Sequence, residues 1–147
     1  IGFINQPYTG ELFVADGNGA FLIARDGNQQ RLRTRKNCAL KDAILFTTSP
    51  KLFTGDEHAA IERLESQVKL SRYGTDCYGA ALVAAGYADI WIEAGLQPYD
   101  IVGIVPLIEQ AGGIVTTING DRPEDGGTII ACGSSELHSE AIAAFNG

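Results

Sequence analysis

The first part of the chain contains three short runs rich in apolar residues. Residues 11–16 alternate with period two, residues 2–6 form a short apolar run that Pro7 ends, and residues 20–24 are again strand-like. Alternation of this kind indicates strands with one buried face, and the Gly- and Asn-containing sequences after the second and third runs are typical of tight turns. The pattern therefore predicts an antiparallel meander within residues 1–40, with sheet edges left open to further pairing.

Strand-like and helix-like patterns alternate in the rest of the chain. Apolar strand-like runs lie at residues 42–48, 68–71, 88–94, 113–118 and 127–132. Helical patterns occupy residues 54–68, 77–85, 100–112 and 134–145. This alternation predicts an α/β domain over residues 41–147, a layered sandwich whose mixed, mostly parallel sheet is flanked by helices.

Several local features mark the expected helix boundaries. Thr54 and Glu57 have the spacing of a capping box, in which each side chain satisfies a free amide at the helix start. Gly86 ends the second helix, since glycine adopts the left-handed cap conformation without steric cost. Pro106 lies inside the third helix, where its missing N–H favours a kink.

Composition and charge narrow the classes of function. Hydrophobic residues make up 45% of the 147 positions, which is enough for a folded core. The net charge of −7 disfavours binding to nucleic acids and anionic membranes, and no apolar run approaches the ~20 residues of a membrane span. The chain begins at Ile1 within a strand-like run, which indicates part of a longer protein.

Cysteine spacing bears on the compartment and on metal binding. The three cysteines lie far apart and include no C-x-x-C pair, so a zinc site is not expected. Cys77 and Cys132 lie in apolar segments, which predicts buried thiols. Unpaired cysteines indicate a reducing compartment, and we expect a cytoplasmic protein.

A basic cluster follows the predicted meander. It consists of Arg31, Arg33, Arg35 and Lys36. Charged runs usually face water, so one interpretation is a solvated edge or linker, and the alternative is a surface that attracts an anion. The histidines have no acid and nucleophile close by in sequence, and we assign no catalytic histidine.

Most candidate chemistry lies between residues 72 and 100. A glycine turn at Gly74 opens an apolar helix, Glu93 ends the following strand, and Asp100 begins the next helix. Carboxylates at a strand exit and a helix entry are typical of α/β active sites. Structural interpretations remain open for both acids, because Asp100 fits an ordinary helix cap and Glu93 could face solvent on an alternating strand.

The run RYGTDCYGAALVAAGYADIWIEAGLQPYDIVGIVPLIEQAGG, residues 72–113, is similar to the second half of the inositol monophosphatase-like, Mg²⁺-dependent phosphatases. The opening INQPYTGELFVADGNGAF also resembles that family's meander. Within the family, the chain resembles most the histidinol-phosphate phosphatase branch. The details are Thr-Thr-Ser-Pro at 47–50 followed by Phe53, Asp-Cys-Tyr at 76–78, and Glu-Ala-Gly-Leu at 93–96 with Pro-Tyr-Asp at 98–100. The resemblance covers nearly the whole chain.

The resemblance implies a partial inositol monophosphatase-like fold, with residues 1–40 as the remnant of an N-terminal α+β domain. The family's first half carries a Glu-Glu pair and an Asp-Pro-(Ile/Val)-Asp-Gly-Thr motif, which supply most metal ligands. Neither occurs in this sequence. We therefore expect an intact homodimeric enzyme nearly twice as long, a partnership of this chain with that N-terminal half, and no activity from this chain alone.

Asp100 corresponds to the family's aspartate that binds Mg²⁺ at the start of a helix, and we expect it to act in catalysis and to contact the substrate. Mg²⁺ prefers carboxylate and water oxygens. Gly74 and Thr75 correspond to the family's substrate loop, where helix-start amides favour anions and hydroxyls; Thr75 is also a good N-cap. Glu93 corresponds to a substrate-contacting glutamate.

Asp76 belongs to the same loop and indicates a cationic substrate. The inositol branch usually has a small apolar residue at this position. Asp76 and Glu93 could therefore form an anionic pocket for the amine of histidinol phosphate, although Asp76 could equally complement the helix dipole. Arg72 could attract the phosphate or pair with a surface acid.

The expected function is hydrolysis of a small phosphorylated metabolite, with histidinol phosphate as the first candidate. The alternatives are an inositol-1-monophosphatase, a sugar phosphatase of the same superfamily, or a non-catalytic interaction module. The last alternative follows from the absent metal-binding half.

Overall fold

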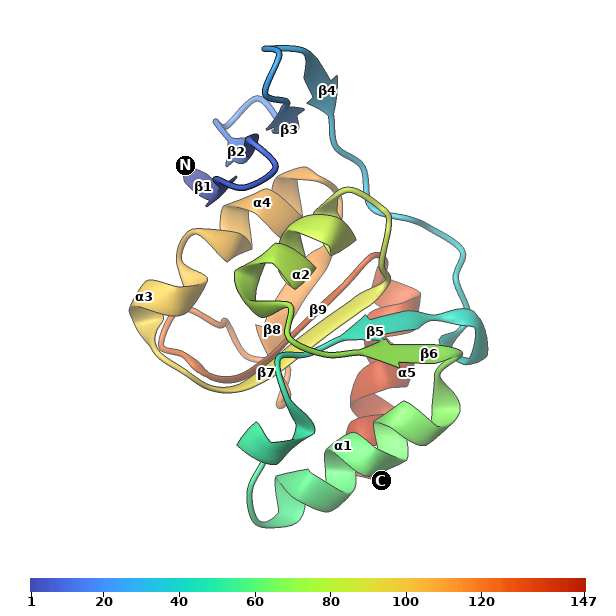
Figure 1. Cartoon of the computed structure of the whole chain (residues 1–147). Coiled ribbons are helices and arrows are strands. Elements are labelled where there is room, and N and C mark those ends of the chain that lie inside the picture. The colour runs from blue at the N-terminus through green and yellow to red at the C-terminus, as the bar shows by residue number, and fades with distance from the viewer.

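The structure is a computed structural model that describes residues 1–147, and it contains two sheets (Figure 1). The first sheet is the predicted meander, and all its pairings are antiparallel in the order β1-β2-β3-β4. Its strands are β1 (Gly2–Gln6), β2 (Glu11–Ala15), β3 (Ala20–Ile23) and β4 (Gln29–Arg31). The three predicted strands are confirmed. The short β4 was not predicted, because its three residues are polar and exposed.

The second sheet has five strands in the order β6-β5-β7-β9-β8. They are β5 (Ile44–Phe46), β6 (Leu70–Arg72), β7 (Ile90–Leu96), β8 (Ile114–Thr117) and β9 (Gly127–Cys132). β5 runs parallel to β6 and β7, whereas β9 runs antiparallel to β7 and β8. The predicted α/β fold with a mixed sheet is therefore confirmed, but the sheet is not mostly parallel, because two of its four pairings are antiparallel.

Helices cover both faces of this second sheet (Figure 1). They are α1 (Asp56–Gln67), α2 (Asp76–Ala84), α3 (Pro98–Ile101), α4 (Ile104–Gln110) and α5 (Ser135–Asn146), with short 3-10 turns η1 (Leu40–Asp42) and η2 (Pro50–Leu52). α1 and α5 pack on one face. α2 and α4 pack on the other face, where they lie between the second sheet and the meander. None of these helices has the length and apolar character needed to cross a bilayer.

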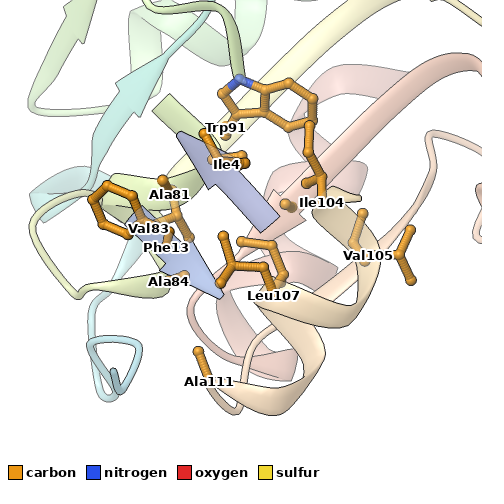
Figure 2. Packing of buried hydrophobic residues seen from close by; sticks show 14 of the residues in the cluster. Ile4, Phe13, Ala81, Val83, Ala84, Trp91, Ile104, Val105, Leu107 and Ala111 are labelled. Carbon is orange, nitrogen blue, oxygen red and sulfur yellow. The ribbon is translucent and has the colours of Figure 1, made fainter. Parts of the chain in front are cut away.

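A continuous apolar core joins the meander to the helices beneath it. Figure 2 shows Ile4 and Phe13 of the meander together with Trp91 of β7 and Leu107 of α4. All four side chains are at most 6% exposed. A second core cluster lies between the opposite sheet face and α1 and α5. The division of the chain at residues 40 and 41 into two domains stays a prediction.

Two helix starts differ from the sequence interpretation. The prediction of a capping box at Thr54 and Glu57 is wrong, because Gly55 occupies the N-cap of α1 at φ 59° and no side chain caps this helix. The Glu57 carboxylate instead accepts from the Thr128 hydroxyl of β9 at 2.8 Å. Thr75 occupies the N-cap of α2, but its hydroxyl makes no cap hydrogen bond.

The third predicted helix is divided in two. α3 ends at Ile101 and α4 begins at Ile104, with a turn between them. Pro106 has no N–H for the carbonyl four residues earlier, so one bond of a continuous helix is missing at this point. Gly86 ends α2 as predicted, with φ 77°. A side chain there would also clash, since a Cβ would lie 2.8 Å from the Arg33 carbonyl oxygen.

The basic cluster fixes the connection between the two sheets. Arg35 forms an ion pair with Asp89, whose side chain is fully buried, through Nε–Oδ1 and Nη2–Oδ2 distances of 2.6 and 2.5 Å. Lys36 Nζ donates to the carbonyl oxygens of Gly112 and Gly133. Arg35 and Lys36 therefore hold together distant parts of the fold. The interpretation of the cluster as a solvated edge or linker does not account for these two residues.

Candidate functional site

A cavity of about 550 Å³ opens where β1, the end of β5, β7, the start of α2 and α3 meet. Three carboxylates line it, those of Asp76, Glu93 and Asp100, together with the hydroxyl-bearing Thr48. No lysine, arginine or histidine lines this cavity. Its lining also includes Trp91, which lies beside Ile4 and Ile104 (Figure 2). The cavity lining therefore combines carboxylates with apolar side chains.

Glu93 is 3% exposed, which rules out the solvent-facing interpretation. Its Oε1 accepts from the Thr48 N–H at 2.6 Å and lies 2.8 Å from the Thr48 hydroxyl. The pKa of Glu93 is raised to about 6, chiefly by burial and also by the charge of Asp76, while hydrogen bonds from Thr48 and Thr47 act in the lowering direction. A carboxyl with such a pKa changes its charge close to neutral pH.

Asp76 has a backbone conformation that is unusual for a non-glycine residue, with φ 43°. Such conformations cost roughly 1 kcal/mol or more and persist where neighbouring contacts enforce them. The Asp76 N–H donates to the Thr48 hydroxyl at 3.1 Å, and its carbonyl oxygen accepts from Trp91 Nε1 at 3.0 Å. The carboxylate is exposed, and its Oδ1 lies 3.1 Å from the Thr48 hydroxyl.

Gly74, Thr75 and Arg72 line a neighbouring hollow of about 630 Å³, which Asp76 also borders. Gly74 has φ 73°, and its N–H donates to the Thr48 carbonyl oxygen at 2.9 Å. The Thr75 hydroxyl is buried without a hydrogen-bond partner. Arg72 makes no ion pair, and its Nη1 donates to the carbonyl oxygen of Ser71. The alternative of a surface ion pair for Arg72 is therefore wrong.

Asp100 is the third residue of α3 and lines the first cavity. Its Oδ2 accepts from the Gln97 N–H at 2.8 Å, so the carboxylate does cap the helix. Its other oxygen has no hydrogen-bond partner in the protein, and the residue is exposed. Capping thus leaves one oxygen free for a ligand, but the metal-binding and catalytic roles of Asp100 stay predictions.

The chemistry of the cavity suits Mg²⁺, but the chain offers only part of a coordination shell. Mg²⁺ takes oxygen ligands and commonly uses one or two carboxylates together with waters and substrate phosphates. Nowhere in the chain do three or more His, Cys, Asp or Glu side chains gather closely enough to hold a metal ion. The free oxygen of Asp100 therefore fits one ligand position, and the remaining ligands must come from elsewhere.

The predicted burial of Cys77 is wrong, whereas that of Cys132 is confirmed. Cys77 is exposed and lines both hollows. It lies in the first turn of α2, before the turns whose alanines pack into the core. The sequence analysis also missed the contribution of Thr48. Its position two residues after β5, beside the parallel strand β7, was the available signal, because adjacent parallel strands bring their carboxyl ends together.

A family model for the inositol monophosphatase family matches residues 1–147. The chain is 36% identical over 97% of its length to the "Bifunctional phosphatase IMPL2, chloroplastic" of Arabidopsis thaliana, of which it covers 42%. It is 29% identical over 99% of its length to a "Histidinol-phosphatase" of Chlorobaculum parvum, of which it covers 55%. An inositol monophosphatase structure from Zymomonas mobilis is 29% identical, with a TM-score of 0.82 over 99% of this chain and 56% of that one.

The chain belongs to the inositol monophosphatase family, because the family model covers its whole length. It spans about half the length of these relatives. The resemblance noted in the sequence is thereby confirmed at the level of the family.

Proposed function

We propose that the chain is the C-terminal portion of a Mg²⁺-dependent phosphomonoesterase that hydrolyses histidinol phosphate to histidinol and phosphate. The observation that carries the substrate choice is the cavity with Asp76, Glu93 and Asp100 and no basic side chain. Mg²⁺ and a substrate amine together carry the three positive charges that match three carboxylates, whereas Mg²⁺ with a neutral polyol would leave one carboxylate unbalanced. Family membership supports phosphate-ester chemistry.

Each residue has a distinct role in this proposal. Asp100 holds Mg²⁺ through its free oxygen, and Mg²⁺ when bound supplies positive charge for the phosphoryl oxygens and a water of lowered pKa. The Thr75 N–H, beside the Gly74 turn at the start of α2, binds a phosphate or hydroxyl oxygen of the substrate, whereas the Gly74 N–H stays bonded to the Thr48 carbonyl oxygen. Asp76 and Glu93 accept hydrogen bonds from the amine, and Arg72 at the neighbouring hollow attracts the anionic ester.

Phosphate release by the intact protein with Mg²⁺ tests this proposal. We expect kcat/KM for histidinol phosphate to exceed that for inositol-1-phosphate and for a sugar phosphate by at least about tenfold, the value of one charge-assisted hydrogen bond. A preference for either neutral alcohol would reject histidinol phosphate in favour of the inositol or sugar branch. The homodimer, the N-terminal half as partner and the cytoplasmic location stay predictions.

A second candidate is a non-catalytic module, which the lack of a three-ligand metal cluster favours. Calorimetric titration of this chain with Mg²⁺ distinguishes the two. Binding tighter than about 1 mM, near −4 kcal/mol, would reject the non-catalytic interpretation. Absence of binding by the chain together with absence of phosphatase activity in the intact protein would support it.

A further inference from the structure

The conformation of Asp76 depends on two residues that lie far from it in sequence. Thr48 follows β5, and its hydroxyl oxygen accepts the Asp76 N–H at 3.1 Å. Trp91 lies on β7, and its Nε1 donates to the Asp76 carbonyl oxygen at 3.0 Å. Both backbone polar groups of Asp76 are therefore bound by side chains of the adjacent parallel strands. These bonds hold the peptide at φ 43°, which an aspartate does not ordinarily prefer.

The Thr48 hydroxyl has one hydrogen and two carboxylate neighbours. Glu93 Oε1 lies at 2.8 Å and Asp76 Oδ1 at 3.1 Å. A hydroxyl donates to one acceptor through its single hydrogen. When the hydrogen points to Glu93, the Asp76 N–H bond persists, since that bond uses a lone pair of the hydroxyl oxygen. The Asp76 carboxylate then has no donor from the protein.

The surroundings of Asp76 offer no substitute donor. No basic side chain lines the cavity, and Arg72, on the neighbouring hollow, forms no ion pair with Asp76. The Asp76 carboxylate is exposed. A donor from a ligand can therefore satisfy it, and a cationic donor would be favoured next to two further carboxylates.

We propose that Thr48 is a positioning residue that determines specificity, because it fixes Asp76 in its left-handed conformation and leaves the Asp76 carboxylate free for a cationic group of the substrate. This inference rests on the proposed function for the choice of substrate, but not for the conformation of Asp76. Thr48 acts through Asp76 and Glu93 and need not touch the reacting phosphate.

The test compares Thr48→Val, which keeps the shape and removes the hydroxyl, with Thr48→Ser, which keeps the hydroxyl. Trp91→Phe removes the indole donor together with part of a buried ring, and it serves as the second variant if Thr48→Val does not fold. The intact protein is assayed with Mg²⁺ on histidinol phosphate and on glycerol phosphate, whose alcohol is neutral. Crystal structures of the same variants report the φ angle of Asp76.

We expect Thr48→Val to lower kcat/KM for histidinol phosphate about tenfold, mainly through KM, with less than about a threefold change for glycerol phosphate. Thr48→Ser should restore the wild-type value, and Asp76 should move to negative φ in Thr48→Val. An equal loss on both esters, or an unchanged Asp76 φ, would overturn the proposal. If the wild type does not act on histidinol phosphate, the proposed function fails, and the φ angle still decides the role of Thr48.

Discussion

Asp89 and Glu93 lie four residues apart, just before β7 and in the middle of β7, and both side chains are buried. Asp89 is fully buried and Glu93 is 3% exposed. The Asp89 carboxylate forms an ion pair with Arg35 through two hydrogen bonds, and it also accepts a hydrogen bond from the N–H of Ile44. Glu93 receives only neutral donors, those of Thr48 and Thr47. One carboxylate is thus neutralised by the fold, and the other is not.

The difference separates a structural acid from a candidate ligand-binding acid. A buried charge normally needs an opposite charge within the fold. Glu93 has none, and the charge of its neighbour Asp76 adds repulsion. Burial without a counter-charge, at the edge of a cavity, is typical of functional sites. The three predictions that follow test this difference, from the largest expected effect to the smallest.

Removal of the Asp89 counter-charge should have the largest effect on stability. Arg35→Leu leaves Asp89 buried and unpaired, which should lower the free energy of unfolding by about 3 kcal/mol. Arg33→Leu is the matched control, since Arg33 forms no ion pair. Urea unfolding measures both variants. A loss of less than about 0.5 kcal/mol in Arg35→Leu, within the range of ordinary surface changes, would mean that the pair does not balance Asp89.

Asp100→Asn should affect turnover far more than folding. The variant keeps the cap acceptor but loses the charged oxygen proposed to hold Mg²⁺, so kcat of the intact protein should fall about 100-fold or more. The melting temperature should change little. Asp125→Asn is the control, as Asp125 is exposed and lies outside the cavity. Unchanged turnover in a folded Asp100→Asn protein would remove this residue from the site.

Glu93 should give a smaller, pH-dependent effect. Its pKa is raised in the folded state, so the folded protein binds a proton more tightly than the unfolded chain, and the resulting stability is lost as pH rises from about 4.5 to about 6. The loss should reach about 2 kcal/mol, and Glu93→Gln should abolish it.

The Glu93 effect must be measured as the difference between wild type and Glu93→Gln. Burial lowers the pKa of His138, so protonation of this residue favours the unfolded chain. His138 therefore lowers the free energy of unfolding as pH falls below about 6.5, whereas Glu93 lowers it as pH rises. His138 is present in both proteins and cancels. A flat difference between pH 4 and 7 would show that Glu93 has an ordinary pKa.

The sequence pattern was sufficient for most elements of the fold, although not for β4 or the division between α3 and α4, and it was not sufficient for the contacts between elements. β7 and α5 were predicted because their apolar residues are regularly spaced and clearly bounded. The pairs Arg35–Asp89 and Thr48–Glu93 join residues 54 and 45 positions apart. The sequence identifies these residues as charged or polar, but it does not show which of them form pairs, because the pairing depends on the order of the strands in the sheet. The positive φ of Asp76 likewise arises from tertiary contacts and not from a glycine at that position.

The most direct measurement is the titration of the Glu93 carboxyl by carbon NMR, in the free protein and with histidinol added. We expect a midpoint near 6 in the free protein, and a lower midpoint with histidinol because a bound cation favours the charged carboxylate. Asp89, with its internal counter-charge, should not respond to histidinol. A Glu93 midpoint near 4.5 that histidinol does not move would contradict the assignment of this cavity to a cationic substrate.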